Sequence, residues 1–131
     1  MPTVSKKIFR IKKRKHKDPN FEPQKFYNST IWRKAAKRHR KKQPLCEVGL
    51  LYGRLDPAEC VDHVISIFHG GAKLDPANFQ SLTREVHAMK TRGEEQGQIY
   101  KSIENDEGDL IPERDEYGQL IPIKNVQGVT T

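Results

Sequence analysis

The sequence predicts a small α+β domain in which two short strands are followed by a helix. The stretch Glu59–Phe68 is rich in β-branched and aromatic residues, which favours a strand. A shorter extended segment containing Phe79 and Leu82 follows a glycine turn and favours a second strand. From Ser81 or Leu82 to about Glu95, apolar residues recur at helical spacing, which predicts the helix.

This last helix is expected to bury one apolar stripe. Leu82, Val86 and Met89 fall at positions i, i+4 and i+7, so they share a face. We expect Ser81 to cap the helix at its start and Gly97 to stop it.

Charge divides the 131-residue chain into three parts. Residues 1–45 hold 16 Lys or Arg and only two acidic residues, whereas residues 102–131 hold two basic and seven acidic residues. The middle of the chain is nearly neutral. We therefore expect the basic N-terminal part and the acidic C-terminal part to have different roles. A chain of this length supports one compact domain.

The first 25 residues form a lysine-rich stretch without apolar periodicity, so we expect a disordered tail there. The tail lacks the apolar run of a secretory signal, and no segment of the chain approaches a membrane span. Cys46 and Cys60 do not make a disulfide framework. These features predict an intracellular, cytoplasmic protein that does not enter membranes.

A basic helix is expected from Asn28 to Lys42, ending before Pro44. Ile31 and Ala35, with Trp32 and Ala36, are its candidates for the core. Its basic side chains form either a solvated face or a clamp on the phosphates of a duplex. They are Arg33, Lys34, Lys37, Arg38, Arg40 and Lys41, followed by Lys42.

Two further segments are less regular. Pro44–Ala58 is expected to be a loop or knuckle with a short apolar run. Near the end of the chain, Asp106–Pro112 recurs as Asp115–Pro122, which suggests two turn-plus-strand units that can form a hairpin. We expect the segment to be an appended, partly disordered tail. The alternative is an acidic arm that folds over the basic face or docks a partner protein.

Four residues, in the first predicted strand, in the loop after it and on the last helix, carry chemistry. Asp62 is a hard oxygen ligand, His87 is a nitrogen ligand 25 residues later, and His63 is a titratable base beside the first. Together these groups suit metal-assisted hydrolysis of a phosphodiester. Each residue also has a simpler explanation when taken alone. Asp62 and His63 could be an exposed pair at the end of a strand, and His87 could be a histidine at the boundary of the core. Asn78 could be an ordinary turn residue. His69 is another candidate, for which a loop role is simpler.

Residues 26–97 resemble the HNH endonucleases of the ββα-metal superfamily, particularly the small phage-type proteins. The shared motifs occur in the same order along the chain. They are Trp32-Arg33, Pro44-Leu45-Cys46, Val61-Asp62-His63-Val64, Gly70-Gly71, Asp75–Leu82 with Asn78 inside it, and His87-Ala88-Met89-Lys90-Thr91.

The resemblance implies a role for each residue of the set. His63 would be the general base that deprotonates the attacking water, and Asp62 and His87 would hold one divalent cation. Asn78 would brace the loop that orients the base, and Lys90 would position phosphates together with the basic helix. Mg²⁺ or Mn²⁺ is the expected ion, although an oxygen and an imidazole ligand also accept Ni²⁺ or Zn²⁺.

The chain departs from many of these relatives in the cysteines of a structural zinc site. At the four ligand positions it has Cys46, Gly49, Thr83 and Val86, so we predict that it binds no structural zinc. Apolar side chains would have to supply the missing stability, and the candidates are Leu45, Leu50, Leu51, Tyr52 and Val86.

The resemblance implies an HNH nuclease domain at 26–100, between a basic tail at 1–25 and an acidic tail at 101–131. The expected function is metal-dependent nicking or cleavage of double-stranded DNA that leaves a 5′-phosphate, in phage DNA packaging or homing and in the host cytoplasm. Two alternatives stay open. One is a non-catalytic basic nucleic-acid-binding protein, and the other is a partner module of a phage packaging complex, acting with a terminase.

Overall fold

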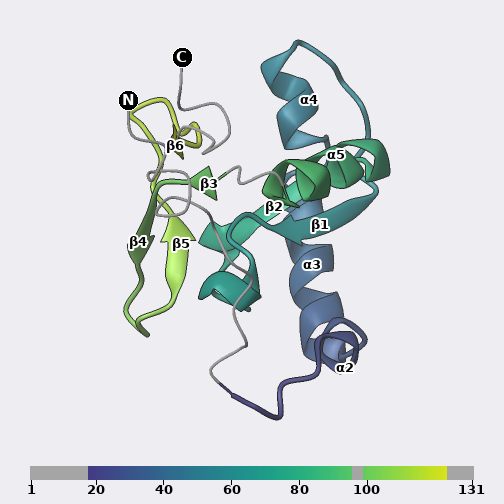
Figure 1. Ribbon diagram of the computed structural model, residues 1–131. Helices are drawn as coiled ribbons and strands as arrows, with labels where there is room; N and C mark the ends of the chain where they lie inside the picture. Colours follow the sequence, from purple (N-terminus) through teal and green to yellow (C-terminus); the bar gives the residue numbers. More distant parts are fainter. Residues whose placement is uncertain (1–17, 96–98, 124–131) are drawn as a thin grey trace, which may run out of the picture.

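The computed structural model describes residues 18–95 and 99–123, and it confirms the predicted α+β class (Figure 1). The helices are α2 (Pro23–Tyr27), α3 (Thr30–Lys42), α4 (Glu47–Leu51) and α5 (Arg84–Glu95), with short 3-10 helices η1 (Ile67–His69) and η2 (Pro76–Asn78). The strands are β1 (Cys60–His63), β2 (Phe79–Leu82), β3 (Ile99–Tyr100), β4 (Ser102–Glu104), β5 (Leu110–Pro112) and β6 (Pro122–Ile123). None of the described helices could span a membrane.

The centre of the domain is the antiparallel pair of β1 and β2, against which α3 packs. Each strand has four residues, so β1 is shorter than the predicted stretch Glu59–Phe68. The strand ends early because the Ser66 hydroxyl accepts a hydrogen bond from the backbone N–H of Phe68 and starts η1. The Ser66 carbonyl then accepts from the N–H of Gly71, which turns the chain back.

Helix α3 begins where the sequence predicted a cap, and of its candidate core residues it buries Trp32 but leaves Ile31 exposed. The Ser29 hydroxyl accepts from the N–H of Trp32, and the helix ends at Lys42, before Pro44. Trp32 is 7% exposed and packs against Phe79 of β2, whereas Ile31, expected in the core, is 65% exposed. The large indole sets the rotation of the helix because it gains more from burial than the aliphatic side chain beside it.

Residues expected to be a loop instead form α4, which is fastened by polar groups. The Cys46 thiol caps the helix by accepting from the N–H of Gly49. A single carboxylate oxygen of Glu47 lies 2.9 Å from His39 Nε2 of α3 and 2.6 Å from the backbone nitrogen of Ser81 in β2. Glu47 therefore ties α4 to α3 and β2 at once.

This arrangement corrects the expectation that apolar side chains stabilise the segment in place of zinc. Leu50, Leu51 and Tyr52 are 41%, 57% and 80% exposed, so they contribute little to the core. Leu45 and Val86 are half-buried. The Glu47 carboxylate is the group that joins the elements here.

We expect Glu47→Ala to lower the free energy of unfolding by about 2 to 3 kcal/mol, because it leaves the Ser81 N–H without its acceptor. Urea unfolding followed by the fluorescence of Trp32, the single tryptophan, measures the change. Glu113→Ala is the matched control, since the Glu113 side chain forms an exposed ion pair of 3.9 Å with Lys101, and it should cost less than about 1 kcal/mol. Equal losses in the two variants would contradict the role of Glu47.

Helix α5 begins at Arg84, later than predicted. The prediction that Leu82, Val86 and Met89 form one buried stripe on this helix is wrong. The Thr83 hydroxyl accepts from the N–H of Val86, while the predicted cap, Ser81, lies in β2. Leu82 is buried as a strand residue, and Met89 is 55% exposed. Gly97, the expected end of the helix, lies outside the described residues.

Part of the N-terminal segment expected to be disordered is ordered. Residues 18–25 include the start of α2, and the ring of Phe21 contacts the rings of Phe26 and Phe68 at centroid distances of 6.0 and 6.1 Å. Residues 1–17 lie outside the described part of the chain. The packed part of the chain therefore begins before residue 26.

The described part of the acidic C-terminal segment is also ordered, which corrects the expectation of an appended tail. Its two echoed units form turns with Gly108 at φ 81° and Gly118 at φ 79°, and β4 pairs with β5 in the first of them. Leu110 of β5 bonds on both sides to the glycine loop: its carbonyl accepts from the N–H of Ala72, and its N–H donates to the carbonyl of Gly70. Figure 1 shows this hairpin beside the central strands.

Candidate active site

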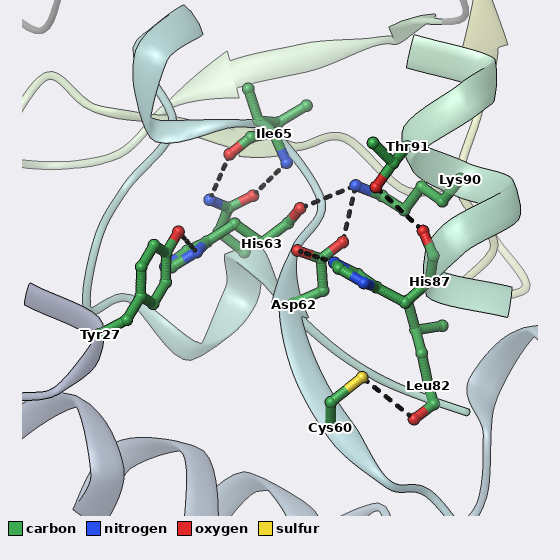
Figure 2. A network of polar contacts seen from close by, with 10 residues as sticks. Tyr27, Cys60, Asp62, His63, Ile65, Leu82, His87, Lys90 and Thr91 are labelled. Atoms are coloured by element: carbon green, nitrogen blue, oxygen red, sulfur yellow. Dashed lines mark hydrogen bonds and ion pairs between the residues drawn. The ribbon is translucent and has the colours of Figure 1, made fainter. Parts of the chain in front are cut away.

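Strand β1 sends its two chemical side chains to opposite sides (Figure 2). Adjacent residues of a strand alternate in direction, so Asp62 faces α5 whereas the ring of His63 points towards α2 and α3. The structure therefore brings Asp62 and His87 together, as predicted, but it does not place the imidazole of His63 beside them.

The Asp62 carboxylate is the centre of a charged cluster with two residues of α5. Its Oδ1 lies 3.6 Å from His87 Nε2, and its Oδ2 lies 2.8 Å from Lys90 Nζ. The Lys90 ammonium also donates to the backbone carbonyl of His63 at 3.0 Å. His87 and Lys90 are three residues apart, so one face of α5 presents both groups to the same carboxylate.

The cluster keeps Asp62 ionised. Burial opposes its ionisation, but the His87 imidazole and the Lys90 ammonium outweigh that effect and lower the pKa of Asp62 to about 2. A carboxylate with so low a pKa is available as a cation ligand throughout the neutral and mildly acidic range.

This shift predicts how Asp62 contributes to acid stability. A carboxyl whose pKa is lower in the folded chain stabilises the fold above its unfolded pKa, near 3.9, and loses that contribution as the pH falls towards 2. In metal-free protein, the difference in unfolding free energy between wild type and Asp62→Asn should shrink by up to about 2 kcal/mol between pH 6 and pH 2. Urea titrations at several pH values test this, and a difference independent of pH would contradict it.

His63 lies in an aromatic pocket and is 3% exposed. Its ring stacks on Trp32 at a centroid distance of 4.7 Å and an interplanar angle of 26°. Its Nε2 lies 2.9 Å from the carbonyl of Lys73, and its Nδ1 lies 3.2 Å from the hydroxyl of Tyr27. Burial in this pocket lowers the pKa of His63, so the imidazole is neutral at pH 7.

The partners of His63 determine which ring nitrogen is basic. A carbonyl only accepts, so Nε2 must carry the proton that it donates to Lys73. Nδ1 then has the lone pair and accepts from the Tyr27 hydroxyl. Tyr27 is 37% exposed, so one side chain separates the basic nitrogen from solvent.

Sequence reasoning did not identify Tyr27 or Lys73 as partners of this histidine. The available signal was the aromatic pair Phe26-Tyr27 immediately before a helix that carries Trp32. The contact from Lys73 is made by its backbone carbonyl, which no side-chain pattern reveals.

Asn78 is fully buried and joins two parts of the loop that follows β1. Its Oδ1 accepts from the N–H of Ile65 at 2.8 Å, and its Nδ2 donates to the carbonyls of Ile65 and Ala72 at 3.0 and 2.9 Å. Its own backbone carbonyl accepts from the N–H of Val64. The side chain thus holds the chain on the C-terminal side of His63 in place.

The basic side chains predicted to contact DNA fall into two groups. Those of α3 are exposed to solvent, and they are Arg33, Lys34, Lys37, Arg38, Arg40 and Lys41. Lys90 is different, because its side chain is 10% exposed and paired with Asp62.

No protein-family model matches the chain, and no curated protein matches it. A solved structure does: the HNH endonuclease of the deep-sea thermophilic bacteriophage GVE2, determined with manganese ion. The two are 28% identical over 55% of this chain and 80% of the phage chain, with a TM-score of 0.50. This chain has an HNH fold.

The similar HNH endonuclease was determined with manganese, so we tested whether residues of this chain could hold a divalent ion. Among residues 18–95 and 99–123, no three His, Cys, Asp or Glu side chains gather at one site. Two donor atoms, Asp62 Oδ1 and His87 Nε2, do lie together, 3.6 Å apart. Two atoms that each lie about 2.1 Å from one ion can be at most about 4.2 Å apart, so this separation allows both to contact the same ion. Asp62 and His87 would thus hold one ion as a pair of ligands, and water or phosphate oxygens would supply the others, as Mg²⁺ prefers.

Proposed function

We propose that this chain is a metal-dependent HNH endonuclease that hydrolyses phosphodiester bonds in DNA. One observation carries the proposal: the fold brings a carboxylate of β1 and an imidazole of α5, 25 residues apart in sequence, to 3.6 Å from each other. An ionised oxygen ligand beside a nitrogen ligand suits Mg²⁺ or Mn²⁺, and it also accepts Ni²⁺ or Zn²⁺.

The proposed reaction uses His63 as the general base. The Lys73 carbonyl holds the proton on Nε2, which leaves Nδ1 able to take a proton from water. The depressed pKa keeps the imidazole unprotonated at neutral pH. Water must replace the Tyr27 hydroxyl at Nδ1 for this transfer, and Tyr27, at 37% exposure, is itself in contact with solvent.

The other residues orient the substrate and the base. Asp62 and His87 would hold the ion, which when bound supplies charge neutralisation at the phosphate and at the departing 3′ oxygen. Asn78 fixes the backbone after His63. The exposed basic face of α3 would contact phosphates of double-stranded DNA through charge, without reading its sequence.

A second function is favoured by the burial of His63. Its ring is 3% exposed, and both of its nitrogens have partners, as in a structural histidine. This observation fits a nucleic-acid-binding protein in which the basic face does the work. The similar HNH endonuclease comes from a bacteriophage, which supports a phage origin for this chain. The third function, a partner module that acts with a terminase in DNA packaging, is kept as an alternative for the test below.

Supercoiled plasmid distinguishes these functions. The wild-type protein should convert it to nicked or linear DNA with Mg²⁺ or Mn²⁺. The conversion should not occur when EDTA removes the metal, or when His87→Ala replaces the wild type. Gel retardation measured in EDTA reports binding alone. Intact plasmid with every metal, together with retardation, would establish the binding protein instead, and cleavage only after adding a terminase would establish the packaging module.

A further inference from the structure

The Lys90 ammonium occupies a position that is built for a cation. It contacts the Asp62 carboxylate at 2.8 Å and the carbonyl oxygen of His63 at 3.0 Å (Figure 2). Carboxylate and carbonyl oxygens are also the ligands that hard divalent ions take in proteins. The side chain is 10% exposed, so the contact is shielded from solvent and is held more firmly than a surface ion pair.

The same carboxylate is the one that the proposed function assigns to the metal. Lys90 approaches Oδ2, whereas His87 lies nearest to Oδ1, so the two residues of α5 share one acidic group between them. An ammonium and a divalent ion that both contact one small carboxylate repel each other strongly where water is scarce.

We propose that Lys90 is an internal counter-ion of the active site that competes with the divalent metal ion for Asp62 and leaves when the ion binds. The inference rests on the proposed metal-binding function, and it adds that Lys90 sets the affinity of the site for the divalent ion. Lysine is suited to the role because its charge sits on a flexible four-carbon stem, which moves without moving the helix. The displaced ammonium remains close enough to meet a phosphate oxygen, the role that the HNH resemblance gives it.

Removal of the competing charge should tighten metal binding. If the lysine holds Asp62 for nine-tenths of the time or more, its loss raises the apparent affinity by about tenfold or more. Calorimetric titration of the full chain with Mn²⁺ should therefore give a lower Kd for Lys90→Gln than for wild type.

Two control variants separate charge from packing. Lys90→Arg keeps a cation beside Asp62 and should bind Mn²⁺ within a few-fold of wild type. Lys101→Gln removes an exposed lysine whose partner is Glu113, and it should leave the Kd unchanged. Equal Kd values for Lys90→Gln and wild type would overturn the proposal.

A measurement on the wild-type chain avoids the case in which a Lys90 variant fails to fold. Reductive methylation followed by mass spectrometry reports how fast each lysine reacts. Lys90 should react slowly in EDTA and several-fold faster with saturating Mg²⁺, whereas Lys101 should react at the same rate in both. A rate at Lys90 that does not change with bound metal would overturn the proposal.

The outcomes also distinguish this inference from the function on which it rests. Absence of Mn²⁺ binding by both wild type and Lys90→Gln would refute the proposed metal site itself. Binding by wild type that His87→Ala weakens, with no gain in Lys90→Gln, would keep the metal site and refute only the competition.

Discussion

Plasmid nicking by His63→Ala should be slower than nicking by the wild type by about 10² to 10⁴-fold, the usual contribution of a general base. Nδ1 of His63 is the basic nitrogen in its pocket, because the Lys73 carbonyl fixes the proton on Nε2. Among the described residues, the side chain that contacts that nitrogen is Tyr27, whose hydroxyl donates its proton to Nδ1 and does not take one from it. The rate constant for nicking at saturating Mn²⁺ measures the loss.

The alanine variant also leaves a cavity between Trp32 and Phe79, so a matched variant must separate chemistry from packing. His63→Phe keeps a ring of similar size in the stack and removes both nitrogens. It should unfold at a higher urea concentration than His63→Ala and nick DNA equally slowly. Nicking by His63→Phe at the wild-type rate would show that the pocket needs an aromatic ring there and not a base.

The convergence of Asp62 and His87 could be predicted from sequence because it depends on local order. The antiparallel pairing sets Asp62 opposite Gln80, and α5 starts directly after β2, so the carboxylate lies near the helix that carries His87. The residue types at these two places indicated a metal. The basic face of α3 was also predictable from local sequence. A stretch without Gly or Pro favours a helix, and its charged side chains stay on the face that contacts solvent.

The environment of His63 could not be predicted in the same way. Strand alternation alone separates the ring of His63 from Asp62, and the adjacency of the two in sequence suggested the opposite. The pocket is built from α2 and α3, which are distant in sequence, and from the Lys73 carbonyl, a backbone group that no side-chain pattern reveals. Tertiary contacts of this kind also order the C-terminal hairpin, whose Leu110 pairs with the glycine loop.

The second large effect is expected at Asn78, whose amide makes three hydrogen bonds with no exposure to solvent. Asn78→Ala should lower the free energy of unfolding by about 3 kcal/mol or more, because it leaves the N–H of Ile65 and the carbonyls of Ile65 and Ala72 without partners and opens a cavity. Urea unfolding measured by Trp32 fluorescence tests this. A loss below about 1 kcal/mol would mean that water replaces the amide.

Asn78→Asp isolates the hydrogen bonds from the volume, because the two side chains have nearly the same shape. The carboxylate can still accept from the N–H of Ile65, but its second oxygen would face the carbonyls of Ile65 and Ala72 at the distances where the amide nitrogen now donates. Burial and these carbonyls would raise the pKa of the introduced carboxyl above its unfolded value, so protonation stabilises the folded variant. The deficit of Asn78→Asp relative to wild type should therefore be largest near pH 7 and should shrink as the pH falls through that raised pKa. An aspartate that costs nothing at pH 7 would show that the loop is held by backbone contacts, and the orientation of His63 would then need no brace from Asn78.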